Sequence, residues 1–293
     1  MSFLADTLPD KSPWAQAVRR QVEASASLDA PVLLTGPAGS GKSHLAGVLH
    51  QASSRSAAPI VTLDAALLPG TLFHGEAFGH GAGGMLRGVG AAIGALRAAG
   101  PGTVVIENVD RLSPEAQRDL AVALERRAVV PLGMDAPVPF AARVLATSEL
   151  EIAAEATAGR FDPALATILL AGEIRVASLA DRREDLESLI AHFARESGIA
   201  GGEAWLTPAA IEWMRAYVWP GNVGELKTLI ARLAASGRPR IGRAAVRRLL
   251  APDLSPWSAD HRYVERTRFP GLASQRSARG ACRSTADASN CRR

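Results

Sequence analysis

The chain has 293 residues, of which 47% are hydrophobic and 21% are charged, and its formal net charge is +4. No apolar run approaches the length of about 18 residues that would indicate a membrane span. Residues Met1 to Lys11 lack the basic cap and apolar stretch of a secretory signal. Cys282 and Cys291 are the only cysteines, which excludes a disulfide framework, and the histidines are scattered without metal-ligand spacing. We therefore expect a cytoplasmic protein without a membrane segment.

The positive charge is concentrated near the end of the sequence. Residues 251–293 contain eight arginines against four carboxylates, and they show no helical or strand periodicity. We expect residues 253–293 to form a disordered basic tail. Nucleic-acid binding through this tail is an alternative. The tail contains few interleaved aromatic residues, so solvated disorder is the preferred interpretation and direct DNA binding is not expected.

The first predicted helix begins at Ser12-Pro13, because serine suits the N-cap and proline the first helical turn. The apolar run from Pro31 to Leu34 predicts a buried strand. A second helix follows, indicated by the i, i+3, i+4 spacing of Leu45, Val48 and Leu49.

The segment between this strand and this helix fits the phosphate-loop pattern G-x-x-x-x-G-K-[ST] at every fixed position. Its residues are Gly36, Pro37, Ala38, Gly39, Ser40, Gly41, Lys42 and Ser43. Glycines let backbone N–H groups face phosphates, and the helix N-terminus adds partial positive charge. In this pattern Lys42 reaches the β- and γ-phosphates and the Ser43 hydroxyl binds Mg²⁺. The sequence therefore predicts an ATP and Mg²⁺ site formed by these eight residues.

Further strand-like runs occur at residues 59–63, 103–106 and 143–146, with helical stretches between them. This alternation predicts an α/β fold with a parallel sheet covered on both faces. Glycine recurs between residues 79 and 94, which indicates a mobile or closely packed region. Ser113-Pro114 begins another helix, expected to carry Leu120, Val122 and Leu124.

From about residue 178 the pattern becomes entirely helical. Thr207 is the expected cap of one helix, and Asn222 that of the next, with Glu225 completing a capping box. The expected buried positions are Leu186, Leu189, Ile190, Phe193, Ile211, Met214, Val218, Leu226, Leu229, Ile230 and Leu233. A short basic helix is expected within residues 241–250. We predict an α/β nucleotide-binding domain over residues 1–175 and a helical domain over residues 176–252.

The chain resembles the AAA+ domain of bacterial enhancer-binding proteins, the activators of sigma-54 RNA polymerase, from about Ser12 to Leu250. Besides the phosphate loop, the matching segments are Glu76-Ala77-Phe78-Gly79-His80, Gly159-Arg160-Phe161, Asp181-Arg182-Arg183-Glu184-Asp185 and Trp219-Pro220-Gly221-Asn222-Val223. The resemblance implies a P-loop AAA+ fold, with a doubly wound parallel sheet and a small C-terminal helical lid. It also implies ATP and Mg²⁺, a homo- or hetero-oligomeric ring, and sigma-54 or a sigma-54 activator as partner.

Several functional positions of the family differ in this chain. The family's second acidic motif ends in Asp-Glu, and its positions here are Glu107 and Asn108. Glu107 keeps a carboxylate for Mg²⁺, but the amide of Asn108 cannot accept a proton from water, and general-base assistance contributes about 10²–10⁴ in rate. Asp110 is an alternative carboxylate from a shifted position.

Five other functional positions of the family, and its sigma-54 contact loop, are also changed. The two arginines that act across the subunit boundary correspond to Asp162 and Ile168. The lid arginine corresponds to Gly224, the first-sensor asparagine to Ser148, and the asparagine that couples the γ-phosphate to the moving loop corresponds to Asp64. The sigma-54 contact loop corresponds to residues 83–88, where Met-Leu replaces Phe-Thr.

Two functions remain after this comparison. The first is an ATP-binding regulator related to sigma-54 activators that has weak or no intrinsic hydrolysis and acts with or on a competent activator. The alternative is an active ATP-hydrolysing sigma-54 activator without its own DNA-binding domain.

Overall fold

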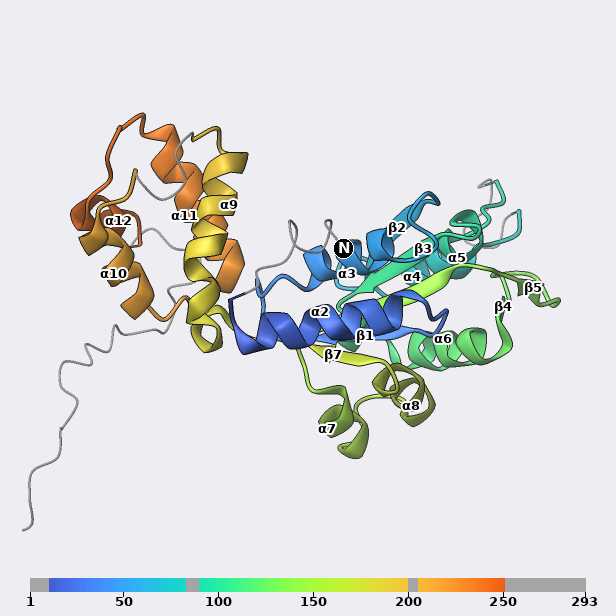
Figure 1. Cartoon of the computed structure of the whole chain (residues 1–293). Helices are drawn as coiled ribbons and strands as arrows, with labels where there is room; N and C mark the ends of the chain where they lie inside the picture. The colour runs from blue at the N-terminus through green and yellow to red at the C-terminus, as the bar shows by residue number, and fades with distance from the viewer. Residues whose placement is uncertain (1–10, 83–89, 200–204, 251–293) are drawn as a thin grey trace, which may run out of the picture. The chain divides into compact units, whose positions relative to one another are not determined.

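The computed structural model describes residues 11–82, 90–199 and 205–250 (Figure 1). Its main sheet has the strand order β2-β3-β6-β1-β7, and all neighbouring strands are parallel. The strands are β1 (Val32–Thr35), β2 (Ile60–Asp64), β3 (Thr103–Glu107), β6 (Arg143–Ser148) and β7 (Glu173–Arg175). Because β1 lies between two later strands, the chain winds in both directions from it. The predicted doubly wound α/β fold is confirmed.

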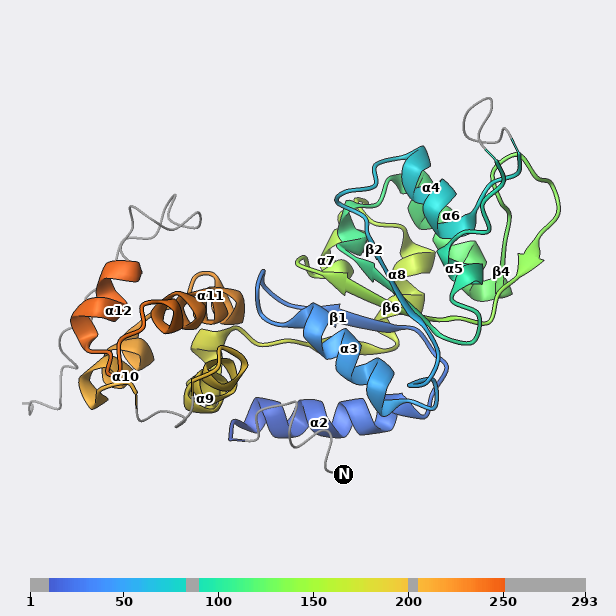
Figure 2. The ribbon, with the colours of Figure 1, turned by 90° about the horizontal axis from the view of Figure 1, so that it is seen from above.

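Helices cover both faces of this sheet. Helices α2 (Pro13–Ala26) and α3 (Lys42–Ala52) lie side by side on one face (Figure 2). The other face carries α4 (Thr71–Phe78), α5 (Ala95–Ala98), α6 (Pro114–Arg126), α7 (Ile152–Thr157) and α8 (Pro163–Leu170). Along β3, Val105 packs with α2 and α3, whereas Val104 and Ile106 pack on the opposite side. This alternation explains why each central strand contains a run of consecutive apolar residues.

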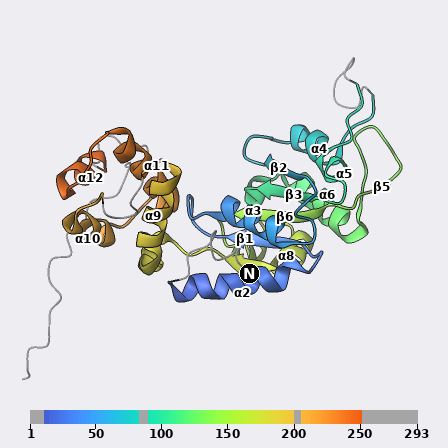
Figure 3. The ribbon, with the colours of Figure 1, turned by 45° about the horizontal axis from the view of Figure 1, so that its top comes forward.

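The described part of the lid contains four helices that share their own apolar core. Figure 3 shows these helices grouped together. They are α9 (Leu186–Glu196), α10 (Pro208–Ala216), α11 (Asn222–Ala235) and α12 (Arg243–Leu249). Two 3-10 turns, η2 (Leu179–Asp181) and η3 (Arg183–Asp185), precede α9. Within the described ranges, no helix is long and apolar enough to cross a bilayer.

Three predicted helix starts are confirmed by their caps. The hydroxyls of Ser12, Ser113 and Thr207 each accept a hydrogen bond from the backbone three residues later. The prediction for Asn222 is wrong, because Gly221 is the N-cap of α11. Glu225 does accept from Gly221 N, at 2.9 Å. The Asn222 side chain is therefore free for contacts outside its own helix.

Val122 lies on α6 as predicted but is 44% exposed, because it lies two residues from both Leu120 and Leu124 on the helix and so faces away from them. Another sequence prediction needs correction. Val218 is 48% exposed, because α10 already ends at Ala216. No sequence pattern predicted β7, the antiparallel ribbon of β4 (Ala128–Val129) with β5 (Val138–Pro139), or the 3-10 turn η1 (Val109–Arg111). The predicted contact loop (residues 83–88) and basic tail (residues 253–293) lie outside the described residues.

Candidate functional site

The phosphate loop connects β1 to α3 through a backbone that requires glycine. Gly41 is the N-cap of α3 and has φ 106°. Gly36 and Gly39 also have positive φ, 150° and 68°. A Cβ atom on Gly36 would lie 2.3 Å from Val176 O, and one on Gly39 would lie 2.4 Å from Gly221 O. The loop therefore packs too closely on its neighbours to admit side chains at these two positions.

Lys42 is buried at the start of α3. Its Nζ donates to the carbonyls of Gly36, at 2.8 Å, and Pro37, at 3.0 Å. It also lies 3.9 Å from Glu149 Oε1. Burial lowers the pKa of Lys42, and the nearby carboxylates, chiefly Glu149, oppose this shift. The loop thus holds one compact cation in place before any anion binds.

The next three loop carbonyls accept hydrogen bonds from the lid segment. Asn222 Nδ2 donates to Ala38 O at 2.8 Å, and Gly224 N donates to Gly39 O at 3.1 Å. The Nη2 atom of Arg182 donates to Ser40 O at 2.5 Å. Each carbonyl from Gly36 to Ser40 is therefore engaged by a donor, which limits the repulsion that free carbonyl oxygens would exert on a phosphate.

Arg182 connects the loop to the start of α2. Its guanidinium lies 4.0 Å from the centre of the Trp14 ring, in a cation–π arrangement. Burial lowers the pKa of Arg182 to about 10, and Asp185 opposes this shift. The Asp185 carboxylate in turn accepts from Ser12 N and Ser12 Oγ, at 2.9 and 2.6 Å. The segment Asp181-Arg182-Arg183-Glu184-Asp185 thus supports the phosphate loop through the hydrogen bond from Arg182 to Ser40 O.

Glu107 and Asn108 lie at the carboxyl end of β3. Asn108 has φ 56°, and its backbone N donates to Thr147 Oγ1 at 3.1 Å. Its side-chain Nδ2 donates to Asp64 Oδ1 at 2.8 Å. A glutamate at position 108 could not donate this hydrogen bond, so the side chains at positions 64 and 108 form a complementary pair. Asp110 is 2% exposed and lies 3.3 Å from Arg111 Nε, and it is not among the side chains that line the neighbouring cavity.

Ser148 does not face the site. Its hydroxyl donates to Leu150 O at 2.8 Å and accepts from Leu150 N at 3.0 Å. The next residue, Glu149, lines the cavity instead, together with Lys42 and Asn108. At this strand end, the side chain that lines the cavity is therefore that of Glu149 and not that of Ser148.

The two residues predicted to replace boundary arginines, Asp162 and Ile168, have structural roles here. Asp162 is the N-cap of α8, and its Oδ1 accepts from Leu165 N at 2.9 Å. Ile168 packs against the main apolar core. Neither side chain can supply a positive charge.

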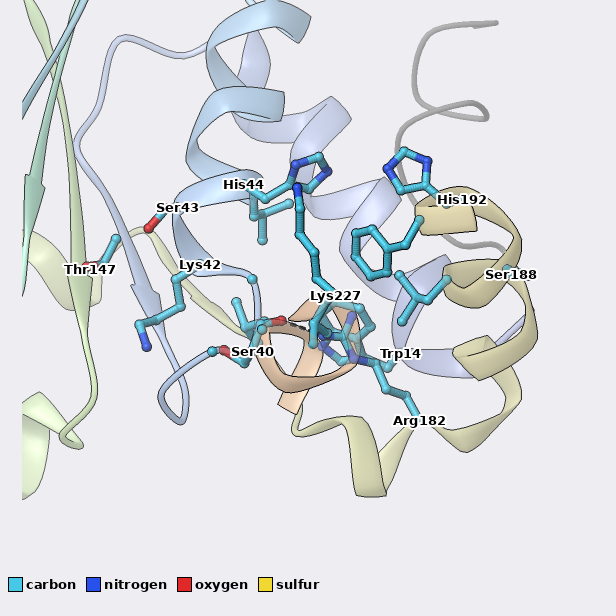
Figure 4. Close-up of a pocket in the computed structure, with 18 of the residues that line it drawn as sticks. Trp14, Ser40, Lys42, Ser43, His44, Thr147, Arg182, Ser188, His192 and Lys227 are labelled. Atoms are coloured by element: carbon cyan, nitrogen blue, oxygen red, sulfur yellow. Dashed lines mark hydrogen bonds between the residues drawn. The ribbon is translucent and has the colours of Figure 1, made fainter. Parts of the chain in front are cut away.

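A cavity of about 660 Å³ adjoins the loop (Figure 4), within the usual size of ligand sites. Trp14, Leu189, Phe193 and Val223 give it apolar walls. Its remaining polar side chains include His44, Ser188, His192, Glu196 and Lys227. Lys227 Nζ lies 3.1 Å from Glu196 Oε2. The sequence reasoning missed Lys227, although two of the chain's three lysines line this cavity and lysine is otherwise rare.

The cavity also contains the predicted magnesium ligands, Ser43 and Glu107. The described residues contain no group of three or more His, Cys, Asp or Glu side chains that could hold a metal. One hydroxyl and one carboxylate suit Mg²⁺, which keeps several waters and takes its other ligands from a substrate phosphate.

Comparison with known proteins identifies the family. Residues 8–175 match the family described as "Sigma-54 interaction domain", and residues 180–249 match the "AAA+ ATPase lid domain". The chain is 33% identical over 237 residues to the C4-dicarboxylate transport transcriptional regulatory protein DctD of Rhizobium meliloti, covering 79% of this chain and 51% of that protein. It is 34% identical over 224 residues to the transcriptional regulatory protein ZraR of Escherichia coli K12, covering 76% of this chain and 51% of that protein.

Among solved structures, NtrX from Brucella abortus in complex with ATP is similar, with a TM-score of 0.72 and 26% identity over 81% of this chain and 53% of that one. NtrX in complex with ADP gives a TM-score of 0.73 and 25% identity over 83% and 55% of the two chains. The chain spans about half the length of the curated relatives it matches. With both matched regions in this order and a phosphate loop between β1 and α3, the chain belongs to the sigma-54 interaction domain family of AAA+ proteins.

Proposed function

We propose that this protein is an ATP-binding AAA+ transcription regulator of the cytoplasm, related to sigma-54 activators. The observation that carries this proposal is the complete phosphate loop, with Lys42 buried beside a cavity of ligand size. The likeness to NtrX structures in complex with ATP and with ADP supports the same ligand class. Residues 36–43 would bind the phosphates, and Ser43 and Glu107 would hold Mg²⁺, which supplies charge neutralisation at the phosphates when bound.

We further propose that intrinsic hydrolysis is weak. Asn108 offers an amide in place of a carboxylate and is held by Asp64. Asp162 and Ile168 supply no arginine to a neighbouring subunit. Because such arginines contribute about 10³–10⁵ in turnover, a homomeric ring of this chain would hydrolyse ATP slowly. None of these three side chains supports the alternative, an active ATP-hydrolysing sigma-54 activator.

The proposed partners follow from the same incomplete site. A ring AAA+ site combines a phosphate loop from one subunit with arginines from the next. This chain has the loop, so a mixed ring with a competent sigma-54 activator would complete it. We propose action with or on such an activator, or on sigma-54 itself.

Calorimetry with ATP and Mg²⁺ tests the binding step. Lys42→Ala should weaken ATP binding at least tenfold, because it removes the buried cation of the loop. The matched control is Lys11→Ala, which removes an exposed lysine outside the cavity. Equal ATP affinity in wild type and Lys42→Ala would refute the site. A steady-state turnover in the range of about 1–100 per second would favour the alternative of an efficient ATPase.

A further inference from the structure

The geometry points to Glu149 as the general base for the slow hydrolysis at this site, in place of the carboxylate missing at Asn108. This inference rests on the proposed function, because it requires ATP in the phosphate loop.

The position of Glu149 is set by β6. This strand pairs with β1 on one side and β3 on the other, so its carboxyl end lies between the phosphate loop and Asn108. Ser148 at the end of β6 is fully buried, and its hydroxyl is hydrogen-bonded to the backbone of Leu150. Glu149 is the first residue beyond the strand, and its side chain is 41% exposed and lines the cavity.

One contact and one cavity place the Glu149 carboxylate where phosphate chemistry would occur. Its Oε1 lies 3.9 Å from Lys42 Nζ, the cation that the loop pattern assigns to the β- and γ-phosphates. Glu149 and Asn108 also line a second, smaller hollow of about 370 Å³, together with Arg111. Glu149 thus borders both the phosphate cavity and the adjoining open space, from which water can reach it.

The other carboxylates near Lys42 are less suitable. Glu107 is the expected Mg²⁺ ligand, and Asp64 already accepts hydrogen bonds from Ala66 N and Asn108 Nδ2. Asp110 is 2% exposed and does not line the cavity. Among the described residues near the loop, Glu149 combines solvent access with proximity to Lys42.

The chemical step requires only water and ATP as reactants. Water oxygen forms a bond to the γ-phosphorus while the water proton passes to the Glu149 carboxylate. The bond between the γ-phosphorus and the bridging oxygen breaks, and its electron pair leaves with ADP. Partial exposure of Glu149 then lets the proton pass to bulk water, which restores the carboxylate.

The test measures single-turnover ATP hydrolysis and, separately, ATP and ADP affinity by calorimetry. Glu149→Gln should lower the hydrolysis rate by a factor of about 10²–10⁴, the range expected for loss of a general base. It should also raise the affinity for ATP relative to ADP, because one negative charge near the γ-phosphate is removed. The matched control is Glu151→Gln, since Glu151 is exposed, pairs with Arg175 and does not line the cavity.

A second variant checks the assignment by moving the carboxylate. Asn108→Glu in the Glu149→Gln background should recover hydrolysis, because positions 108 and 149 border the same two spaces. The inference is overturned if Glu149→Gln hydrolyses ATP at the wild-type rate, or if Glu151→Gln loses as much activity. A wild-type protein that binds ATP but shows no hydrolysis would also overturn it, while the proposed function would stand. Absence of ATP binding by the wild type would instead refute the proposed function.

Discussion

Asn222 links the lid to the phosphate loop, and its replacement by alanine should weaken both stability and ATP binding. Its Nδ2 donates to Ala38 O at 2.8 Å, and its Oδ1 accepts from the buried Leu179 N at 2.9 Å. The side chain is 4% exposed, so water cannot easily replace it. Alanine would leave a backbone donor and a backbone acceptor without their partner.

The size of the effect follows from these two hydrogen bonds. A buried polar group left without a partner destabilises the fold by about 1–3 kcal/mol. Asn222 also has φ 52°, a conformation that costs alanine about 1–2 kcal/mol more than a favourable one. Because Ala38 O is only partly buried, we expect a total loss of about 2–4 kcal/mol. With a denaturant dependence of about 2 kcal/mol per molar urea, the unfolding midpoint should fall by about 1–2 M.

The assay is urea unfolding followed by circular dichroism, with ATP calorimetry under native conditions. Thr228→Ala is the control, because Thr228 lies on the same helix, is exposed and bonds only within that helix. Its unfolding midpoint should change little. If Asn222→Ala lowers the free energy of unfolding by less than about 0.5 kcal/mol and binds ATP normally, the lid contact does not support the loop.

Other predictions concern the strand ends and a buried carboxylate. Asn108→Glu places a second carboxylate beside Asp64, so it should unfold at lower urea than the double variant Asp64→Asn/Asn108→Glu. Equal midpoints for the two would show that the pair at positions 64 and 108 is not coupled. Asn108→Glu should also raise ATPase activity more with an activator partner that has its boundary arginines than alone. An equal gain in both settings would contradict the mixed-ring proposal. Burial raises the pKa of Glu225 above 4.5, so its contribution to stability is present at acidic pH and is lost as pH rises through the raised pKa. The free energy of unfolding of Glu225→Gln should therefore exceed that of wild type at pH 7 and equal it near pH 4. A difference between variant and wild type that is the same at both pH values would rule this out.

The sequence by itself determined the features that depend on local patterns. The phosphate loop was predicted at residues 36–43 because its glycines, lysine and serine act within eight consecutive residues. Helix starts at Ser12, Ser113 and Thr207 were predicted because a cap needs only the next three residues. The central strands were predicted because a parallel strand buried on both faces contains a run of consecutive apolar residues. By contrast, β7 has three residues with only Ile174 buried, which is too short for a periodic signal.

The tertiary structure alone decided which distant residues meet at the loop. Asp64 ends β2 and Asn108 directly follows the neighbouring strand β3, and a hydrogen bond joins their side chains. The donors to the carbonyls at positions 38, 39 and 40 come from residues more than 140 positions away, at 222, 224 and 182. Whether Ser148 or Glu149 faces Lys42 depends on how β6 ends. Strand pairing sets that orientation, and no local pattern records it, because the choice is made by contacts between segments far apart in the chain.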